Sequence, residues 1–254
     1  MKIKLILNIL KWLALATYLI IAMNFVFKQR NNVTCGNLDI NIDKTHNFIN
    51  EDTIKNILIA NEINITNQKS ETINYNQIKK TVEQNTMIKN VNAYRNYNGD
   101  VFIDVKQKNP IMRIITKDNK SYYIDEDYQK LPTSNVYSAN VIVVNGDITD
   151  NFINGIDTMS YSFTPNMLYD FVQKINNDDL WKNQIVQIYI NENKEIELIP
   201  RIGNQIILFG NLNDDQKKLN KLEALYKTFT TDDWNKYATI NLMYTDRIYC
   251  KKRD

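Results

Sequence analysis

The 254-residue chain carries 31 basic and 29 acidic residues, so its formal net charge is only +2. This balance excludes a broad basic surface, and we expect no nucleic-acid partner. About 220 residues follow an apolar N-terminal stretch, enough for one or two small domains with cores of their own.

The apolar stretch runs from Leu5 to Phe27 and is interrupted only by Asn8, Lys11 and Asn24. As a helix it would be about 34 Å long, and the hydrocarbon core of a bilayer is about 30 Å thick. The stretch is too long for the apolar part of a cleaved signal peptide, and a buried core helix is the remaining alternative. We predict a lipid-embedded anchor over 5–27, preceded by a short tail of residues 1–4.

The orientation of this anchor follows from what lies on its two sides. Basic residues flank both ends in similar numbers, so the positive-inside rule gives little contrast. A four-residue tail has nothing to fold inside, whereas a long C-terminal region can be exported past one anchor. We therefore expect a single-pass protein with a cytoplasmic N-terminus and all later residues outside the plasma membrane.

The first exported unit is predicted over residues 34–108 in the order strand, helix, helix, strand, strand. Asn50 is placed to cap the first helix, and the second helix is expected over 76–84. Asn98-Gly99 lies between two alternating runs, which indicates a hairpin because both positions of such a turn take positive φ. The strand and helix patterns rest on regularly spaced apolar residues: Leu38, Ile40, Ile42, Ile54, Ile57, Leu58, Ile78 and Val82.

A second, β-rich unit with two helices is predicted over 109–250, beginning at Asn109-Pro110. Thr164-Pro165 opens one helix, and Asp214 or Asp215 caps the other. The last strand is expected over 238–245, which residues 248–250 could extend before a basic tail at 251–254. Earlier strands are expected at 111–116, 121–124, 141–144, 185–191, 195–199 and 205–209. The fold class is therefore α+β.

Nothing in the chain assembles a catalytic or ligand site. His46 lies in a polar segment with no cysteine nearby, so we interpret it as a loop histidine. The run 125–127 lacks the alternation and glycine turn of a calcium loop, and phosphate-loop, nucleophile-elbow and metalloprotease motifs do not occur. We expect no enzyme, catalytic residue, metal, cofactor or small-molecule substrate. Cys35 and Cys250 could form a disulfide outside the cell or remain two separate thiols.

The absence of chemistry points to binding through the last strand. If the strand over 238–245 is at a sheet edge, its unpaired backbone groups can accept a partner strand. Its apolar row should face the core, although Tyr244 at its end could still reach a partner. The alternative is a plain edge strand shielded by the basic tail. The two faces alternate as Ile240, Leu242 and Tyr244 against Asn241, Met243 and Thr245.

The order of parts resembles the bacterial division proteins FtsQ and DivIB. The β-α-α-β-β unit is similar to their POTRA domain, and VKQKNP at 105–110 resembles the join to their β domain. Three further segments are similar to the Bacteroidetes-type version: WKNQIVQIY at 181–189, PRIGNQIILFG at 200–210 and TINLMY at 239–244.

The resemblance implies a non-enzymatic scaffold at the division septum of the inner membrane. Such a scaffold binds FtsB and FtsL and helps to control septal peptidoglycan synthesis. The resemblance places the FtsB contact on the last strand, with Tyr244 matching the family's tyrosine. Met243 stands where many members have arginine, so Arg247 or Lys251 would have to supply any ion pair. The partner-binding residues expected are Met243, Tyr244, Thr245, Ile248 and Tyr249.

Two other functions compete with this interpretation. One is a membrane-anchored POTRA-type chaperone or secretion adaptor, in which the first unit binds extended substrates. The other is a cell-wall hydrolase, which lacks a visible nucleophile–base set or metal site.

Overall fold

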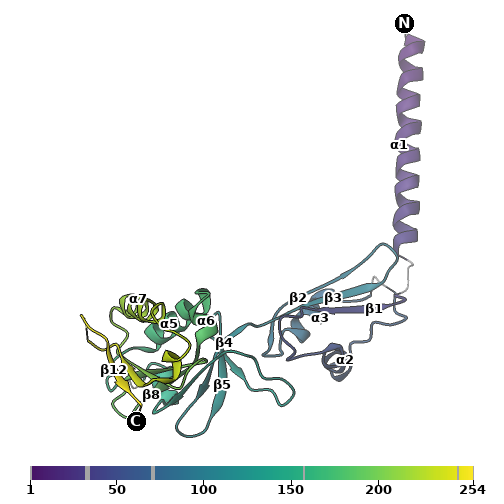
Figure 1. The fold of residues 1–254 in the computed structure, drawn as a ribbon. Coiled ribbons are helices and arrows are strands. Elements are labelled where there is room, and N and C mark those ends of the chain that lie inside the picture. The colour runs from purple at the N-terminus through teal and green to yellow at the C-terminus, as the bar shows by residue number, and fades with distance from the viewer. Residues whose placement is uncertain (1, 32–34, 70–71, 157, 245, 254) are drawn as a thin grey trace. The chain divides into compact units, whose positions relative to one another are not determined.

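The structure is a computed structural model, and it describes residues 2–31, 35–69, 72–156, 158–244 and 246–253. The chain divides into two compact units, Met1–Gln107 and Lys108–Asp254, and each is described by itself. Both units combine helices with a sheet, so the fold is α+β (Figure 1).

Helix α1 spans Lys2–Asn31, and its side chains are described for residues 10–25. Within the described residues, no helix is long and apolar enough to cross a bilayer. The anchor predicted over 5–27 extends beyond these side chains at both ends. Those that are described include many exposed large apolar groups: Leu10, Trp12, Leu13, Leu15, Tyr18, Leu19, Ile20, Ile21, Met23 and Phe25.

The first unit has the predicted order of strand, helix, helix, strand and strand. Its elements are β1 (Leu38–Ile42), α2 (Glu51–Ala60), α3 (Tyr75–Val82), β2 (Ile88–Arg95) and β3 (Val101–Gln107). The sheet order is β1-β3-β2, with β1 parallel and β2 antiparallel to the central β3. Its core is formed by Ile40, Ile54, Leu58, Ile78, Val82, Val91, Ile103 and Val105.

A side-chain cap sets the start of α2, as the sequence predicts. Asn50 accepts the Thr53 N–H at 2.9 Å, and the Thr53 hydroxyl accepts the Asn50 N–H in return at 3.5 Å.

The predicted hairpin between β2 and β3 also forms, but its expected two-residue turn is wrong. Only Gly99 has positive φ there, because the Asn96 side chain accepts the N–H groups of Asn98 and Asp100 and so stabilises a longer loop.

Gln107 organises the loop between β1 and α2. Its side chain is buried, its Oε1 accepts the N–H groups of Phe48 and Ile49 at 3.1 and 3.2 Å, and its Nε2 donates to the carbonyls of Asp43 and His46. Every polar atom of this amide therefore has a partner, as a buried amide requires. His46 lies in this loop, half-buried, as expected of a loop histidine.

The second unit is built on one nine-stranded sheet of order β12-β11-β10-β9-β8-β7-β4-β5-β6. The pairs β4–β7, β7–β8 and β10–β11 are parallel, and the other pairs are antiparallel. The strands are β4 (Pro110–Ile115), β5 (Ser121–Asp125), β6 (Lys130–Pro132), β7 (Ile142–Gly146), β8 (Ile185–Ile190), β9 (Ile196–Pro200), β10 (Ile206–Gly210), β11 (Tyr237–Asn241) and β12 (Tyr249–Lys252).

The two predicted helices of this unit are α5 (Pro165–Asn177) and α7 (Asp215–Tyr226), which pack on the sheet (Figure 1). Thr164 caps α5 by accepting the Met167 N–H at 3.2 Å. Asp214 is the N-cap residue of α7, one of the two residues predicted for that position. It makes no side-chain cap hydrogen bond, since it adopts a left-handed φ of 53° and its carboxylate pairs with Lys217. Three short helices escaped prediction: α4 (Asp150–Ile153), α6 (Trp181–Gln184) and the 3-10 turn η1 (Asp233–Asn235).

Candidate partner-binding edge

The edge of the sheet is one strand further along the chain than the sequence predicts. Strand β11 ends at Asn241 and lies between β10 and β12, so β12 is the edge. The strand expected over 238–245 stops early because the Asn241 side chain accepts the Met243 N–H at 2.9 Å, which turns the chain. The chain then returns antiparallel as β12, with Asn241 opposite Tyr249.

The backbone of β12 has one paired side and one open side. The Arg253 N–H donates to the Lys236 carbonyl at 2.9 Å, and the Leu242 N–H of the preceding segment donates to Leu208 of β10. Successive residues of a strand direct their backbone groups to opposite sides. Tyr249 and Lys251 therefore face β11, and Cys250 and Lys252 direct their N–H and C=O groups outward.

The predicted partner-binding residues fall around this edge. Tyr244 and Tyr249 are 55% and 50% exposed, and their rings meet edge to face with centroids 4.8 Å apart. Met243 is exposed and lies over Gly210, where an added Cβ would be only 3.0 Å from its Cγ. Ile248 is partly buried against the core, and Thr245 lies outside the described residues. The structure thus brings the two tyrosines together and turns Ile248 inward.

Lys221 of α7 holds the turn that presents these tyrosines. Its Nζ donates to the Tyr244 carbonyl at 2.6 Å, which ties the segment between β11 and β12 to the helix. Sequence reasoning missed this residue, because a lysine on a polar helix face carries no signal of a distant backbone contact.

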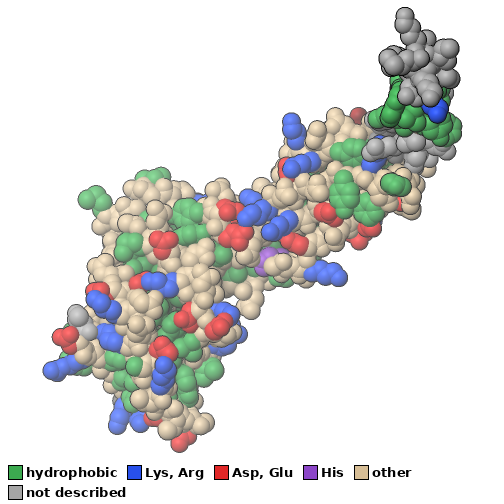
Figure 2. All heavy atoms as spheres, turned by 90° about the horizontal axis from the view of Figure 1, so that it is seen from above, with side chains coloured by type: hydrophobic (Ala, Val, Ile, Leu, Met, Phe, Trp, Pro, Cys, Tyr) green, Lys and Arg blue, Asp and Glu red, His purple; other side chains and the backbone are tan. Residues whose placement is uncertain are grey.

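Basic side chains line the edge strand itself. Lys251 and Lys252, expected in a basic tail, belong to β12 and are exposed. Arg253 has a structural use, since its Nη2 donates to the Asn204 carbonyl at 2.6 Å. Across the described chain, Lys251 and Lys252 form no ion pair. Elsewhere basic and acidic side chains are interspersed on the face in view, without a patch of one sign (Figure 2).

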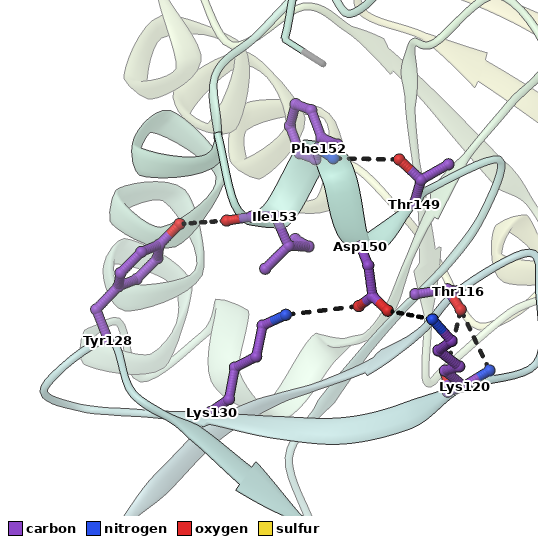
Figure 3. A network of polar contacts seen from close by, with 8 residues as sticks. All are labelled: Thr116, Lys120, Tyr128, Lys130, Thr149, Asp150, Phe152 and Ile153. Carbon is purple, nitrogen blue, oxygen red and sulfur yellow. Dashed lines mark hydrogen bonds and ion pairs between the residues drawn. The ribbon is translucent and has the colours of Figure 1, made fainter. Parts of the chain in front are cut away.

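The opposite end of the sheet is held by an ion-pair network (Figure 3). Asp150, the first residue of α4, lies 2.9 Å from the Nζ of Lys120 and 3.5 Å from that of Lys130. The hydrogen bond from Lys120 is the main reason that the pKa of the Asp150 carboxyl is lowered. Tyr128 donates to the Ile153 carbonyl at 3.4 Å. These contacts join the β4–β5 loop, β6 and α4, which is a structural role.

The two cysteines and the possible metal ligands are the remaining groups with possible chemistry. Cys35, which is buried, and Cys250, which is half-buried, are free thiols, and burial raises the pKa of both. In the parts of the chain that the structure covers, no three histidine, cysteine or acidic side chains are placed to hold a metal ion. The outward backbone groups of β12 are of the kind that can pair with another strand.

The sequence of this second unit matches the family model described as FtsQ/DivIB, C-terminal related, over residues 109–251, more than half of the chain. The chain belongs to the FtsQ/DivIB-related family. A POTRA-like domain model matches residues 33–106, which form the first unit. No curated protein matches the sequence.

Membership of the FtsQ/DivIB-related family indicates a role in cell division, at the division site, among divisome partners. The family is typically non-enzymatic. The predicted α+β fold with a POTRA-like unit and a β-rich unit is confirmed, whereas the predicted membrane-spanning helix is not found among the described residues.

Proposed function

We propose that this FtsQ/DivIB-related chain is a septal scaffold that binds FtsB and FtsL by adding a partner strand to β12. The observation that carries the proposal is the open edge of β12 at the end of a nine-stranded sheet. Backbone groups of Cys250 and Lys252 supply the pairing, and side chains around them supply the choice of partner. Through these partners the scaffold helps to control septal peptidoglycan synthesis.

The side chains of this edge are suited to a partner strand that has both apolar and acidic residues. The exposed Tyr244–Tyr249 pair offers aromatic area at the end of β12. Lys251 and Lys252 are exposed cations without acidic partners in the described chain. We propose Met243, Tyr244, Thr245 and Tyr249 as partner-binding residues, with Met243 contributing apolar contact where many FtsQ and DivIB proteins have arginine. Ile248, which packs against the core, would support the strand from inside.

We propose that residues 5–27 anchor the scaffold in the inner membrane, with residues 1–4 in the cytoplasm and the later units outside. Support comes from the largely apolar sequence and from the exposed apolar side chains of α1 within residues 10–25. Anchoring beside other membrane-bound partners raises their effective concentration, so a short strand interface can suffice. We also propose that the POTRA unit spans residues 34–108 and the β unit residues 109–250. The chain is further proposed to be of the Bacteroidetes type.

A proline at Cys250 tests the edge directly. Cys250→Pro removes an outward N–H from the middle of β12 and leaves the pairing with β11, which uses Tyr249 and Lys251. Cys250→Ala is the matched control, since it removes the same thiol and keeps the N–H. We expect co-purification of FtsB and FtsL with the full-length protein to fall at least about tenfold for proline and little for alanine, because several ladder bonds of about 1 kcal/mol each are disrupted. Equal capture by the two variants, at equal thermal stability, would rule out this edge.

The POTRA-type adaptor remains the alternative, and it requires the first unit to bind extended substrates. Its edge strand β2 has a backbone donor, the Val91 N–H, already bound by Glu83 at 3.1 Å. No described contact favours the adaptor. Depletion separates the two functions: filamentous cells with normal secretion support the scaffold, and normal septa with loss of exported proteins support the adaptor.

A further inference from the structure

Strand β2 is an edge strand of the first unit and spans eight residues. The Asn96 N–H donates to the Asp100 carbonyl at 3.0 Å, so Asn90, Asn92 and Tyr94, which follow the irregularity between Ile88 and Asn90, direct their backbone groups toward β3. Val91, Ala93 and Arg95 therefore direct theirs to the open side. A strand of this length with free backbone groups is a template for pairing with another chain.

Glu83 interrupts that open side at Val91. It is the C-cap residue of α3, and its own N–H donates to the Lys79 carbonyl at 2.9 Å, which fixes its position at the helix end. From there its Oε1 accepts the Val91 N–H at 3.1 Å, and Lys79 lies 3.7 Å from the same oxygen. Of the three outward residues, only Val91 has a side-chain partner in the described part of the chain.

The surrounding core explains why this carboxylate reaches the strand. Val82, which ends α3, and Val91 are both fully buried, so the helix end and the strand are packed together. The chain between them is short, since β2 begins at Ile88. A glutamate side chain at the helix end therefore spans the distance to the strand without leaving the local fold.

We propose that Glu83 guards the β2 edge against strand addition. A carboxylate bonded to a backbone N–H is a charge-assisted contact, which an incoming strand would have to break before forming its own bond. The outward groups beyond Val91 belong to Ala93 and Arg95 alone, too few for a stable ladder. The occupant that the guard excludes is β2 of a second copy, because two identical antiparallel strands pair about a two-fold axis.

Three substitutions in the full-length chain, purified in mild detergent, test the guard. Glu83→Ala and Glu83→Met remove the acceptor, and methionine keeps the length of the side chain. Glu83→Gln keeps a carbonyl oxygen for Val91. The matched control is Glu51→Ala, which breaks the equivalent i,i+4 pair with Lys55, 3.3 Å long, at a helix position with no described hydrogen bond to a strand. Sedimentation velocity over a concentration series reports association, and hydrogen exchange of residues 88–95 locates it.

We expect Glu83→Ala and Glu83→Met to increase the dimer fraction severalfold over the wild type, with slowed exchange in 88–95 in the dimer. Glu51→Ala should behave as the wild type, and Glu83→Gln, which keeps the acceptor oxygen but loses its charge, should associate less than Glu83→Ala and more than the wild type. Adding Ala93→Pro to Glu83→Ala removes the next outward donor and should abolish the added dimer. The proposal is overturned if both acceptor-free variants associate no more than the wild type. It is also overturned if Glu51→Ala associates equally, if the protected segment lies elsewhere, or if Ala93→Pro leaves the dimer intact.

Discussion

The two edge strands of the nine-stranded sheet differ in how far their unpaired backbone groups are protected from pairing with another strand. At one end β6 has three residues, ends in Pro132, and is held by the ion pair between Lys130 and Asp150. Proline lacks the backbone donor that a neighbouring strand would use, and short charged strands discourage pairing. At the other end β12 has no proline, and the backbone groups of Cys250 and Lys252 face outward.

This difference shows where pairing is prevented and where it is left open. The β6 end is fixed from several sides, since Lys130 also lies over the Tyr122 ring at 4.5 Å from its centroid. The β12 end is held mainly by its pairing with β11 and by the contact of Arg253 with the Asn204 carbonyl. One edge is built for stability, and the other keeps free backbone groups that a partner can use.

The largest expected effect comes from Phe152→Ala, in α4, which is joined to the β6 end of the sheet. Phe152 is fully buried in α4, with its ring centroid 3.9 Å from that of Tyr161 and 5.5 Å from that of Phe163. Removing a buried phenylalanine ring costs about 3–5 kcal/mol of unfolding free energy. Urea unfolding checks this, with the exposed Met159→Ala as the neutral control. Partner capture by the β12 edge should persist below the melting temperature, and its loss there would contradict the separation of the two ends.

A smaller effect is expected from Asp150→Asn, and it depends on pH. Because the folded-state pKa of Asp150 is lowered, chiefly by Lys120, its contribution is present above the unfolded pKa of about 3.9 and is lost as pH falls through the lower folded pKa. We expect Asp150→Asn to reduce stability at pH 7 by about 1 kcal/mol. Urea unfolding between pH 7 and pH 2 should show wild type and variant converging at the acid end. A constant difference across that range would mean that Asp150 does not act through its charge.

Regular spacing made most elements of both units predictable from sequence. The apolar face of α5, which includes Leu168, Phe171 and Val172, is fully buried, and Thr164 caps the helix. Helices of one turn, such as α4 and α6, are too short for a periodic pattern. Periodicity therefore gave the framework and left out the short pieces between its elements.

The position of the edge could not be predicted, because it depends on a turn and on non-local pairing. Alternation continues from Ile240 through Leu242 to Tyr244, but the Asn241 side chain turns the chain after β11. Asparagine is compatible with a strand and with a turn, so the pattern alone does not decide between them. The Lys221–Tyr244 contact joins residues far apart in sequence, and no local signal announces it.

The smallest effect, and the one most specific to the open end, is expected from Lys221→Ala. This substitution frees the Tyr244 carbonyl and should change the unfolding free energy by no more than about 1 kcal/mol, because the contact is exposed. Partner capture should nevertheless fall severalfold, since the Tyr244–Tyr249 pair would lose its fixed position beside β12. Lys217→Ala is the matched control, because it removes an exposed lysine of the same helix whose ion pair among the described residues is a local one with Asp214. A titration of the full-length variants with the partner measures this effect. Equal affinities for the two variants would show that partner binding at β12 does not depend on the Lys221–Tyr244 contact. A loss of affinity confined to Lys221→Ala would show that α7 helps to position the β12 edge.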